Sequence, residues 1–307
     1  MVKEYVSFSD QVKIINDFPA PRSPKGYPHF RKFYLNGILS SFQEASPGQE
    51  EIHASYNAVL MQALREKAPT YYVTDEMELA ASNTSVPPMS PNEIPFNYLN
   101  VFTRNIVAAV RLKTMDEACK KIDLRDALGK TAHRNNIQFK GSDAQLVIVA
   151  VIFAADKEVK GAYRRLYLDF IPPYGDNKDV LICTAHAFGY ASDFDEKEIH
   201  MGKSFGALAR LLVNSVLLIK HQPSLVSVEK SVGSGIGFSK KLSDEPMPVR
   251  WLGKNFSNDR TGSRPGGGTH ASPRAHWRRG HWHGYRYGEG RKTLKRKWVQ
   301  PVYANPQ

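Results

Sequence analysis

The segment at residues 144–153 constrains the fold more than any other part of the chain. It reads AQLVIVAVIF, a nearly unbroken apolar run that is rich in β-branched side chains. A half-exposed strand alternates between apolar and polar residues, whereas a strand buried on both faces does not. The segment therefore predicts a central strand of a buried sheet, within a chain whose 41% apolar content supports a folded core.

Other segments predict the elements around this strand. Strand patterns occur at 97–103, 164–171, 180–186 and 248–252, and helical spacing occurs at 8–18, 29–42, 50–68 and 104–121. The third helix follows a capping box at 46–49. The segment 204–219, within a helix expected at 202–220, is apolar but is interrupted by Arg210 and Asn214. It is short of the roughly 20 apolar residues that a membrane span needs. It predicts a buried helix of a soluble protein.

Together these patterns predict an α+β fold. We expect a helical N-terminal portion at 1–95, a central mixed β-sheet with the buried apolar helix at 96–226, a linker at 227–246 and a basic, β-rich C-terminal module at 247–307. Cys119 and Cys183 lie in apolar segments, which is typical of buried free thiols in a reducing compartment. The first residues contain no apolar signal-peptide core, so we expect a cytoplasmic location.

Charge and aromatic residues are concentrated at the C-terminal end. Residues 254–307 contain 12 Lys or Arg and 2 acids, a net +10 of the formal +12 of the whole chain. All four Trp lie between Trp251 and Trp298, and four of the ten His lie between His270 and His283. A basic surface attracts phosphates, and flat rings stack on unpaired bases. This composition predicts RNA or another single-stranded nucleic acid as a partner.

The residues expected to contact RNA are the cations and rings of this segment. They are Trp277, Arg278, Trp282, His283, Tyr285, Arg286, Lys295 and Lys297. The alternative for Trp277, Trp282 and Tyr285 is that their rings belong to the core. On a strand at 293–303, Leu294, Arg296 and Trp298 would share one face, with Lys295, Lys297 and Val299 on the other. A basic run is often only a solvated face, but the charge balance and the neighbouring Trp298 favour contact with nucleic acid.

Three residues of the same segment form a candidate catalytic set. Metal-free RNA cleavage needs a base for the 2′-hydroxyl proton, an acid for the leaving 5′-oxygen and a cation at the phosphorane. His276, His281 and Arg279 are the residue types that supply these functions. The alternative is that the segment binds RNA without cleaving it.

Metal and nucleotide cofactors are not expected. His281 and His283 could chelate a metal with His276 or His270, but no cysteine and no zinc-finger spacing lies nearby. The glycines at 233–237 lack the full dinucleotide-loop spacing, and the Gly-Lys-Ser at 202–204 lacks the earlier glycine of a phosphate loop. Direct contacts of the histidines with RNA are the simpler interpretation.

The C-terminal motif resembles that of a known family. Arg278–Tyr285 reads RRGHWHGY and is followed by Gly290, Trp298, Pro301 and Asn305. This pattern is similar to the C-terminal signature of a phage and plasmid family whose best-known member is a type V-A anti-CRISPR protein. The resemblance implies recognition of the nascent N-terminal polypeptide of a CRISPR nuclease and decay of the mRNA under translation. The implied partners are therefore that peptide, its mRNA and the ribosome, in a bacterial cytoplasm.

Overall fold

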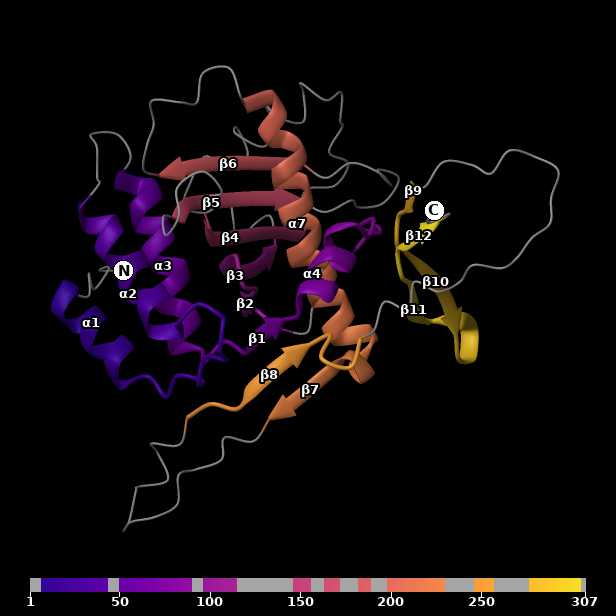
Figure 1. Cartoon of the computed structure of the whole chain (residues 1–307), viewed down its shortest axis with the longest axis horizontal. Helices are drawn as coiled ribbons and strands as arrows, with labels where there is room; N and C mark the ends of the chain where they lie inside the picture. The colour runs from indigo at the N-terminus through magenta and orange to yellow at the C-terminus, as the bar shows by residue number, and fades with distance from the viewer. Residues whose placement is uncertain are drawn as a thin grey trace, which may run out of the picture.

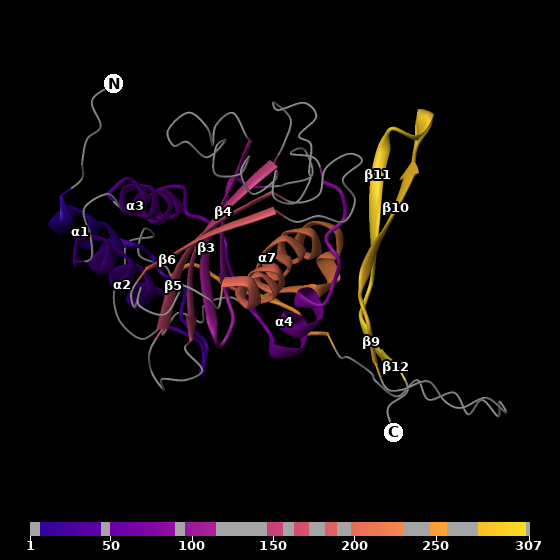
Figure 2. The same cartoon turned by 90° about the horizontal axis from the view of Figure 1, so that it is seen from above.

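The protein has the expected α+β architecture (Figure 1). A computed structural model describes residues 7–43, 50–89, 96–114, 146–155, 163–171, 182–188, 198–229, 246–256 and 276–304. Three layers are visible from above in Figure 2: a group of helices, a sheet, and a long helix that carries a β-ribbon on its outer side. None of the described helices is both long and apolar enough to cross a membrane.

The central layer is an eight-stranded sheet with the order β6-β5-β4-β3-β2-β1-β8-β7. Its strands are β1 (Thr70–Val73), β2 (Tyr98–Phe102), β3 (Ile106–Thr114), β4 (Leu146–Ala155), β5 (Tyr163–Ile171), β6 (Ile182–Phe188), β7 (Val226–Glu229) and β8 (Val249–Leu252). Strands β2 to β6 form an antiparallel meander. Strand β1 runs parallel to both of its neighbours, β2 and β8, and β7 closes the edge antiparallel to β8.

Helices cover both faces of the sheet. On one face lie α1 (Phe8–Asp17), α2 (Phe30–Gln43) and α3 (Glu50–Arg65), and on the other lie α4 (Asp75–Ser82) and α7 (Glu198–His221), which leads into the 3-10 helix η3 (Pro223–Leu225) (Figures 1 and 2). The protein has two hydrophobic cores, one on each face of the sheet, and β2 contributes side chains to both. Phe102 packs toward α1–α3, whereas Leu99 and Val101 pack toward α7. Burial on both faces explains why these strands lack polar alternation.

The core beneath α1–α3 is aromatic and contains a buried hydrogen-bonded group centred on Asn100. The Tyr34 hydroxyl donates a hydrogen bond of 2.7 Å to Asn100 Oδ1, and Asn100 Nδ2 donates to the carbonyl of Ala68 and to Thr70 Oγ1. Each side-chain atom of Asn100 is thereby paired, which avoids the cost of burying an unsatisfied amide. Burial in this core raises the pKa of the Tyr72 hydroxyl to about 12.

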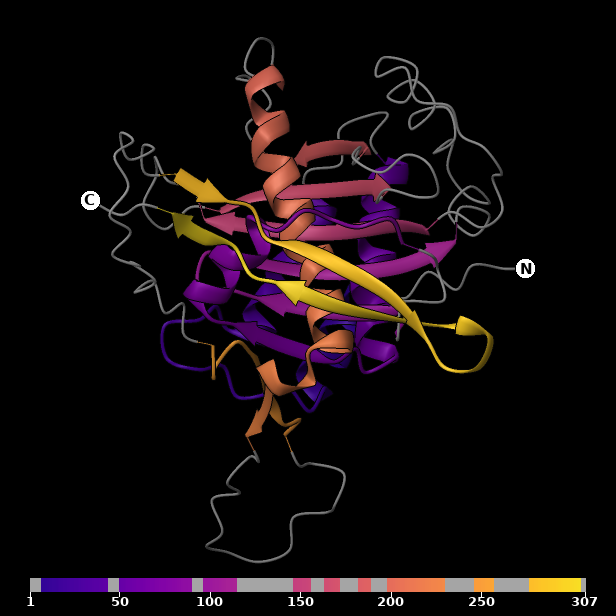
Figure 3. The same cartoon turned by 90° about the vertical axis from the view of Figure 1, so that its right-hand side faces the viewer.

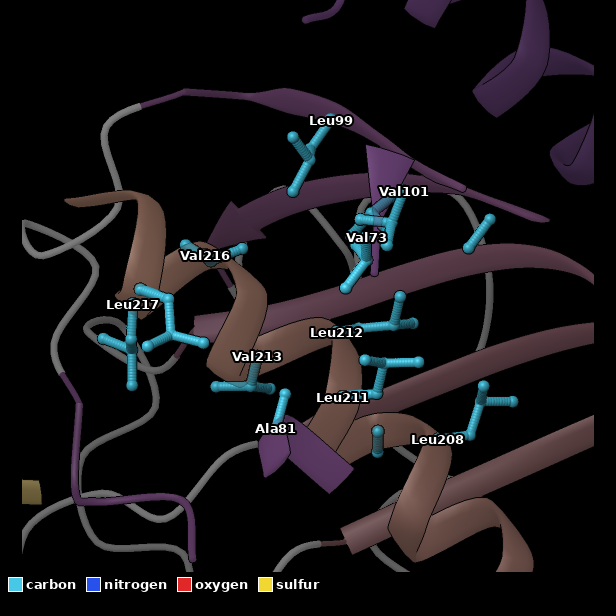
Figure 4. Packing of buried hydrophobic residues seen from close by; sticks show 14 of the residues in the cluster. Val73, Ala81, Leu99, Val101, Leu208, Leu211, Leu212, Val213, Val216 and Leu217 are labelled. Carbon is cyan, nitrogen blue, oxygen red and sulfur yellow. The ribbon is translucent and has the colours of Figure 1, made fainter. Parts of the chain in front are cut away.

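The second core is built on α7 (Figure 4). Every residue from 211 to 218 is buried. A helix packed on one side buries only every third or fourth residue, so an all-round apolar helix must be covered on both sides. Leu212 and Val213 lie among the residues that pack with the sheet and with Ala81 of α4. The outer side of α7 is covered by α4 and by the C-terminal ribbon.

The structure differs from the expectations in three places. The segment 104–121 was expected to be helical, but Ile106–Thr114 is strand β3, paired along its length with β4. The segment of β1 was assigned to a helical region, yet its four residues are all buried in the sheet. Strand β8, assigned to the C-terminal module, pairs with β1. The capping box at 46–49 lies outside the described residues.

We predict that Gly253→Ala destabilises the fold strongly. Gly253 follows β8 with φ +90, and an added Cβ would meet the side chain of Met77 and lie 2.9 Å from Thr74 Oγ1. The left-handed backbone and the collision should together lower the free energy of unfolding by about 3 kcal/mol or more. Gly26→Ala is the matched control, since its φ is +86 but its nearest neighbour is 3.8 Å away. Urea unfolding of both variants should rank Gly253→Ala well below Gly26→Ala; equal losses would contradict the packing argument.

Candidate nucleic-acid interface

Residues 276–304 form a two-stranded β-ribbon that is interrupted at residues 279–280 and 300–301. We call this interruption the joint. Its strands are β9 (His276–Arg278), β10 (His281–Tyr287), β11 (Thr293–Val299) and β12 (Val302–Ala304), with the 3-10 helix η5 (Glu289–Arg291) at the tip. Strand β10 pairs with β11, and β9 pairs with β12, both antiparallel. In Figure 3 the ribbon crosses the outer side of α7 diagonally, with its tip projecting away from the helix.

Gly280 fixes the joint of the ribbon to the end of α4. Its amide donates to the carbonyl of Asn83 at 3.1 Å, and its carbonyl accepts from the amide of Ser85 at 2.8 Å. An added Cβ would collide with Thr84 Oγ1 and lie 2.8 Å from Pro301 Cδ. The first glycine of the RRGHWHGY motif is therefore required for the close approach of two backbones.

The ribbon face that looks toward α7 holds two tryptophans. Trp282 is 9% exposed, and its Nε1–H donates to Asn214 Oδ1 at 2.9 Å. Trp298 Nε1–H donates to Thr84 Oγ1 at 3.2 Å, and the two indole centroids are 6.5 Å apart. On the same face Arg296 is buried and donates to the carbonyl of Pro88. These contacts attach the ribbon to the body of the protein.

Asn214 joins three elements at this contact. Its Nδ2 group donates to the carbonyls of Ala81 and Thr84, at 2.9 and 2.8 Å. Its Oδ1 accepts from Trp282. The amide is fully buried and both of its ends are paired, so the polar interruption of the apolar helix links α4, α7 and β10.

The opposite ribbon face is exposed to solvent, and we call it the outward face. It includes His281, His283, Tyr285, Tyr287, Lys295 and Lys297, together with Thr293 and Val299. The ring centroids of His283 and Tyr285 are 6.5 Å apart, and those of Tyr285 and Tyr287 are 6.4 Å apart. Lys295 Nζ lies 5.9 Å from the centroid of the Tyr287 ring. Rings of one strand are thus interleaved with cations of the other.

The charge of the ribbon is almost entirely positive. Residues 276–304 contain eight Lys or Arg and one acid, Glu289. Apart from the buried Arg296, these cations are exposed: Arg278, Arg279, Arg286, Arg291, Lys292, Lys295 and Lys297. Exposed cations beside exposed rings are the combination that binds a nucleic-acid strand through its phosphates and bases.

The structure separates the expected RNA-binding residues into two groups. Arg278, His283, Tyr285, Arg286, Lys295 and Lys297 are exposed, as RNA contact requires. Trp282 was expected to contact RNA, with burial as the alternative, and its ring is buried and hydrogen-bonded to Asn214. It is an anchor of the ribbon and offers no free face to a base. Trp277 lies on β9, and its side chain is outside the described residues.

The candidate catalytic residues lie on either side of the joint. His281 begins β10 and Arg279 precedes Gly280, and both side chains are exposed. His276 begins β9, opposite Ala304, and its side chain is outside the described residues. The convergence of the two imidazoles on one phosphate therefore stays a prediction.

Sequence reasoning missed the residues that attach the ribbon. Asn214 and Gly280 were not assigned any role, although Asn214 was recognised as an interruption of the apolar helix. The expected strand faces were correct, because Arg296 and Trp298 point inward whereas Lys295 and Lys297 are exposed. That alternation was the available signal that one side of the motif would be covered.

A second charged cluster lies at the ends of β1 and β2. Arg104 Nε forms an ion pair with Asp75 at 3.1 Å, and its guanidinium lies 5.8 Å from the centroid of the Tyr27 ring. Burial raises the pKa of Glu78, while a hydrogen bond with Thr103 acts in the opposite direction. The cation of this cluster, Arg104, is paired with Asp75, and Glu78 adds a further acid, so the ribbon is the better candidate for binding a polyanion.

Comparison with known proteins identifies one family. The model of the AcrVA2-like family, described as the anti-CRISPR type V subtype A2 family, matches residues 141–306, more than half of the chain. The matched range extends from just before β4 to beyond β12 and so includes α7 and the ribbon. No curated protein and no solved structure matches the chain.

We predict that Trp282→Phe weakens the attachment of the ribbon. The substitution keeps an aromatic ring but leaves Asn214 Oδ1 without its donor, which should lower the free energy of unfolding by about 1–3 kcal/mol. Tyr285→Leu is the control, because Tyr285 is 40% exposed and on the opposite face, and it should change stability by less than about 0.5 kcal/mol. Urea denaturation measures both. Identical midpoints for Trp282→Phe and the parent would argue against the hydrogen bond as an anchor.

We also predict that RNA binding by the ribbon depends steeply on salt. If about six phosphates are contacted, affinity should fall on the order of a thousandfold between roughly 50 and 200 mM salt. Lys297→Ala should reduce the slope of log affinity against log salt by about one, because one phosphate contact is lost. Fluorescence anisotropy with labelled RNA measures the slope. A flat response would exclude the ribbon cations as the binding surface.

Proposed function

The chain belongs to the AcrVA2-like family of type V subtype A2 anti-CRISPR proteins, and on that basis we propose that it lowers production of a type V-A CRISPR nuclease. In this proposal the protein recognises the nascent N-terminal polypeptide of the nuclease and promotes decay of the mRNA from which it is translated. It acts on the ribosome-bound message in the cytoplasm of a bacterial host, and its gene is carried by a phage or plasmid.

The outward face of the ribbon is the observation that carries the RNA-binding part. It places two tyrosines, two histidines and two lysines on one exposed surface. The inward face of the same strands is used for attachment, so the outward side chains are not needed to hold the fold. A rigid, basic and aromatic surface without a structural duty is suited to hold an mRNA strand.

The arrangement of layers leaves room for two partners. Helix α7 lies between the sheet and the ribbon, and α1–α3 lie on the far side of the sheet (Figure 2). We propose that the α+β body binds the nascent peptide while the ribbon holds the message. A peptide bound on the side of α1–α3 and an RNA strand bound on the outward face of the ribbon would not compete for the same surface.

Decay of the message has two candidate routes. In the first, His276 and His281 act as acid and base and Arg279 stabilises the phosphorane, so that the protein is a metal-independent ribonuclease. In the second, the protein is a nucleic-acid-binding regulator that does not cleave, and a host ribonuclease degrades the RNA. The exposure of Arg279 and His281 favours the second route, because catalytic electrostatics are strongest where water is excluded.

We predict that the two routes separate in cells that express matched amounts of protein variants. A catalytic role requires that His276→Ala and His281→Ala each reduce mRNA depletion by roughly 100-fold or more, since a general acid or base contributes typically that factor. Arg279→Lys should also impair depletion, because Lys retains the charge but loses the two-pronged phosphate contact. RNA sequencing reads the outcome: one message or operon should fall with the parent. If both His variants deplete the mRNA as fully as the parent does, the two histidines are not catalytic and the route through a host ribonuclease is favoured.

Incubation of the purified protein with labelled RNA in EDTA provides the complementary measurement. Cleavage products would demonstrate intrinsic, metal-free activity. Shifted but intact RNA would support a binding module that depends on a host nuclease. RNA that is neither shifted nor cleaved would overturn the assignment of the ribbon as an RNA-binding surface.

A further inference from the structure

We propose that the outward face binds RNA only as an extended, unpaired strand, with bases on the ring ladder of β10 and phosphates along the lysines of β11. This inference rests on the RNA-binding part of the proposed function and specifies the form of RNA that the surface accepts. The ring ladder consists of His283, Tyr285 and Tyr287, which alternate along one strand and therefore share one face.

The spacing of the ladder fits unstacked bases. Successive ring centroids are separated by 6.5 and 6.4 Å. Consecutive base pairs of a duplex are separated by about 3.4 Å, roughly half of that distance. A strand whose bases are pulled apart can place one base at each ring, whereas a duplex cannot match the spacing.

Accessibility of the rings gives the second argument. Tyr285 is 40% exposed and Tyr287 is 49% exposed, so each ring has surface available to a base. In a duplex the base faces are already stacked on their neighbours, and recognition of double-stranded RNA relies on shape and on the 2′-hydroxyls and phosphates of its grooves. A row of exposed rings along one strand therefore adds affinity for unpaired bases and none for paired bases.

The lysines define where the backbone of the strand runs. Lys297 lies directly opposite His283 and Lys295 lies directly opposite Tyr285 in the ladder of β10 and β11. Lys295 Nζ is also 5.9 Å from the centroid of the Tyr287 ring. A base on one of these rings thus has an ammonium group beside it, on the side of β11, to pair with its phosphate. Contacts of this kind read the backbone and not the sequence, so the surface should tolerate any base.

The test compares the full-length protein with two pairs of variants. Tyr285→Leu and Tyr287→Leu remove the ring but keep an apolar side chain, whereas Tyr285→Phe and Tyr287→Phe keep the ring. Fluorescence anisotropy is measured with a short unstructured RNA and with the same RNA annealed to its complement. Each Leu variant should bind the single strand roughly 5- to 100-fold more weakly, each Phe variant should bind like the parent, and duplex binding should be weak and unchanged throughout.

The remaining outcomes are distinct. Equal affinity of the parent for single-stranded and duplex RNA, or Leu variants that bind the single strand as well as the parent, would overturn the ladder while leaving RNA binding by the basic ribbon intact. No binding of either RNA by the parent would overturn the ladder and the RNA-binding part of the proposed function together. Because both tyrosines are exposed, circular dichroism spectra of the Leu variants should match that of the parent and exclude misfolding as the cause.

Discussion

The hydrogen bond from the indole of Trp282 to the amide of Asn214 holds the outer layer of this protein in place. It is buried, and it forms part of a set in which the same amide donates to two backbone carbonyls at the end of α4. An amide at this depth is tolerated only when its oxygen and its nitrogen are both paired. The side chain of Asn214 thus contacts the ribbon and α4 from its position on α7 and links these three elements.

The pleat of the ribbon gives it one face that attaches to the body of the protein and one face that is exposed. Alternate residues of β10 and β11 point to opposite sides. The side that carries Trp282 and Trp298 packs against the body of the protein, and the other side is exposed to solvent. A motif that looks in sequence like one mixture of rings and charges is two surfaces in space. The outward surface has fixed geometry because the inward one is anchored, which is the condition for a binding site to be preorganised.

Much of this architecture follows from the sequence, and the failures have physical causes. The buried strand β4 and the all-apolar helix α7 were predicted because two-sided burial leaves a continuous apolar pattern. The segment of β3 was predicted as a helix, because VAAV suits either structure and only pairing with β2 and β4 decides. The sequence left two alternatives for Trp282, stacking or burial, and could not decide between them because its partner Asn214 is 68 residues away.

The parallel arrangement around β1 has a consequence for the order in which the chain folds during its own synthesis. The hydroxyl of Thr74, at the end of β1, donates to the carbonyl of Gly253, 179 residues later. Contacts of such sequence separation close slowly, because the entropy of a long loop must be lost first. On one side, strand β1 can pair with β8 only after the long segment between them has been synthesised. The ribbon follows β8 along the chain, so its outward face is completed only after all eight strands of the sheet have been synthesised.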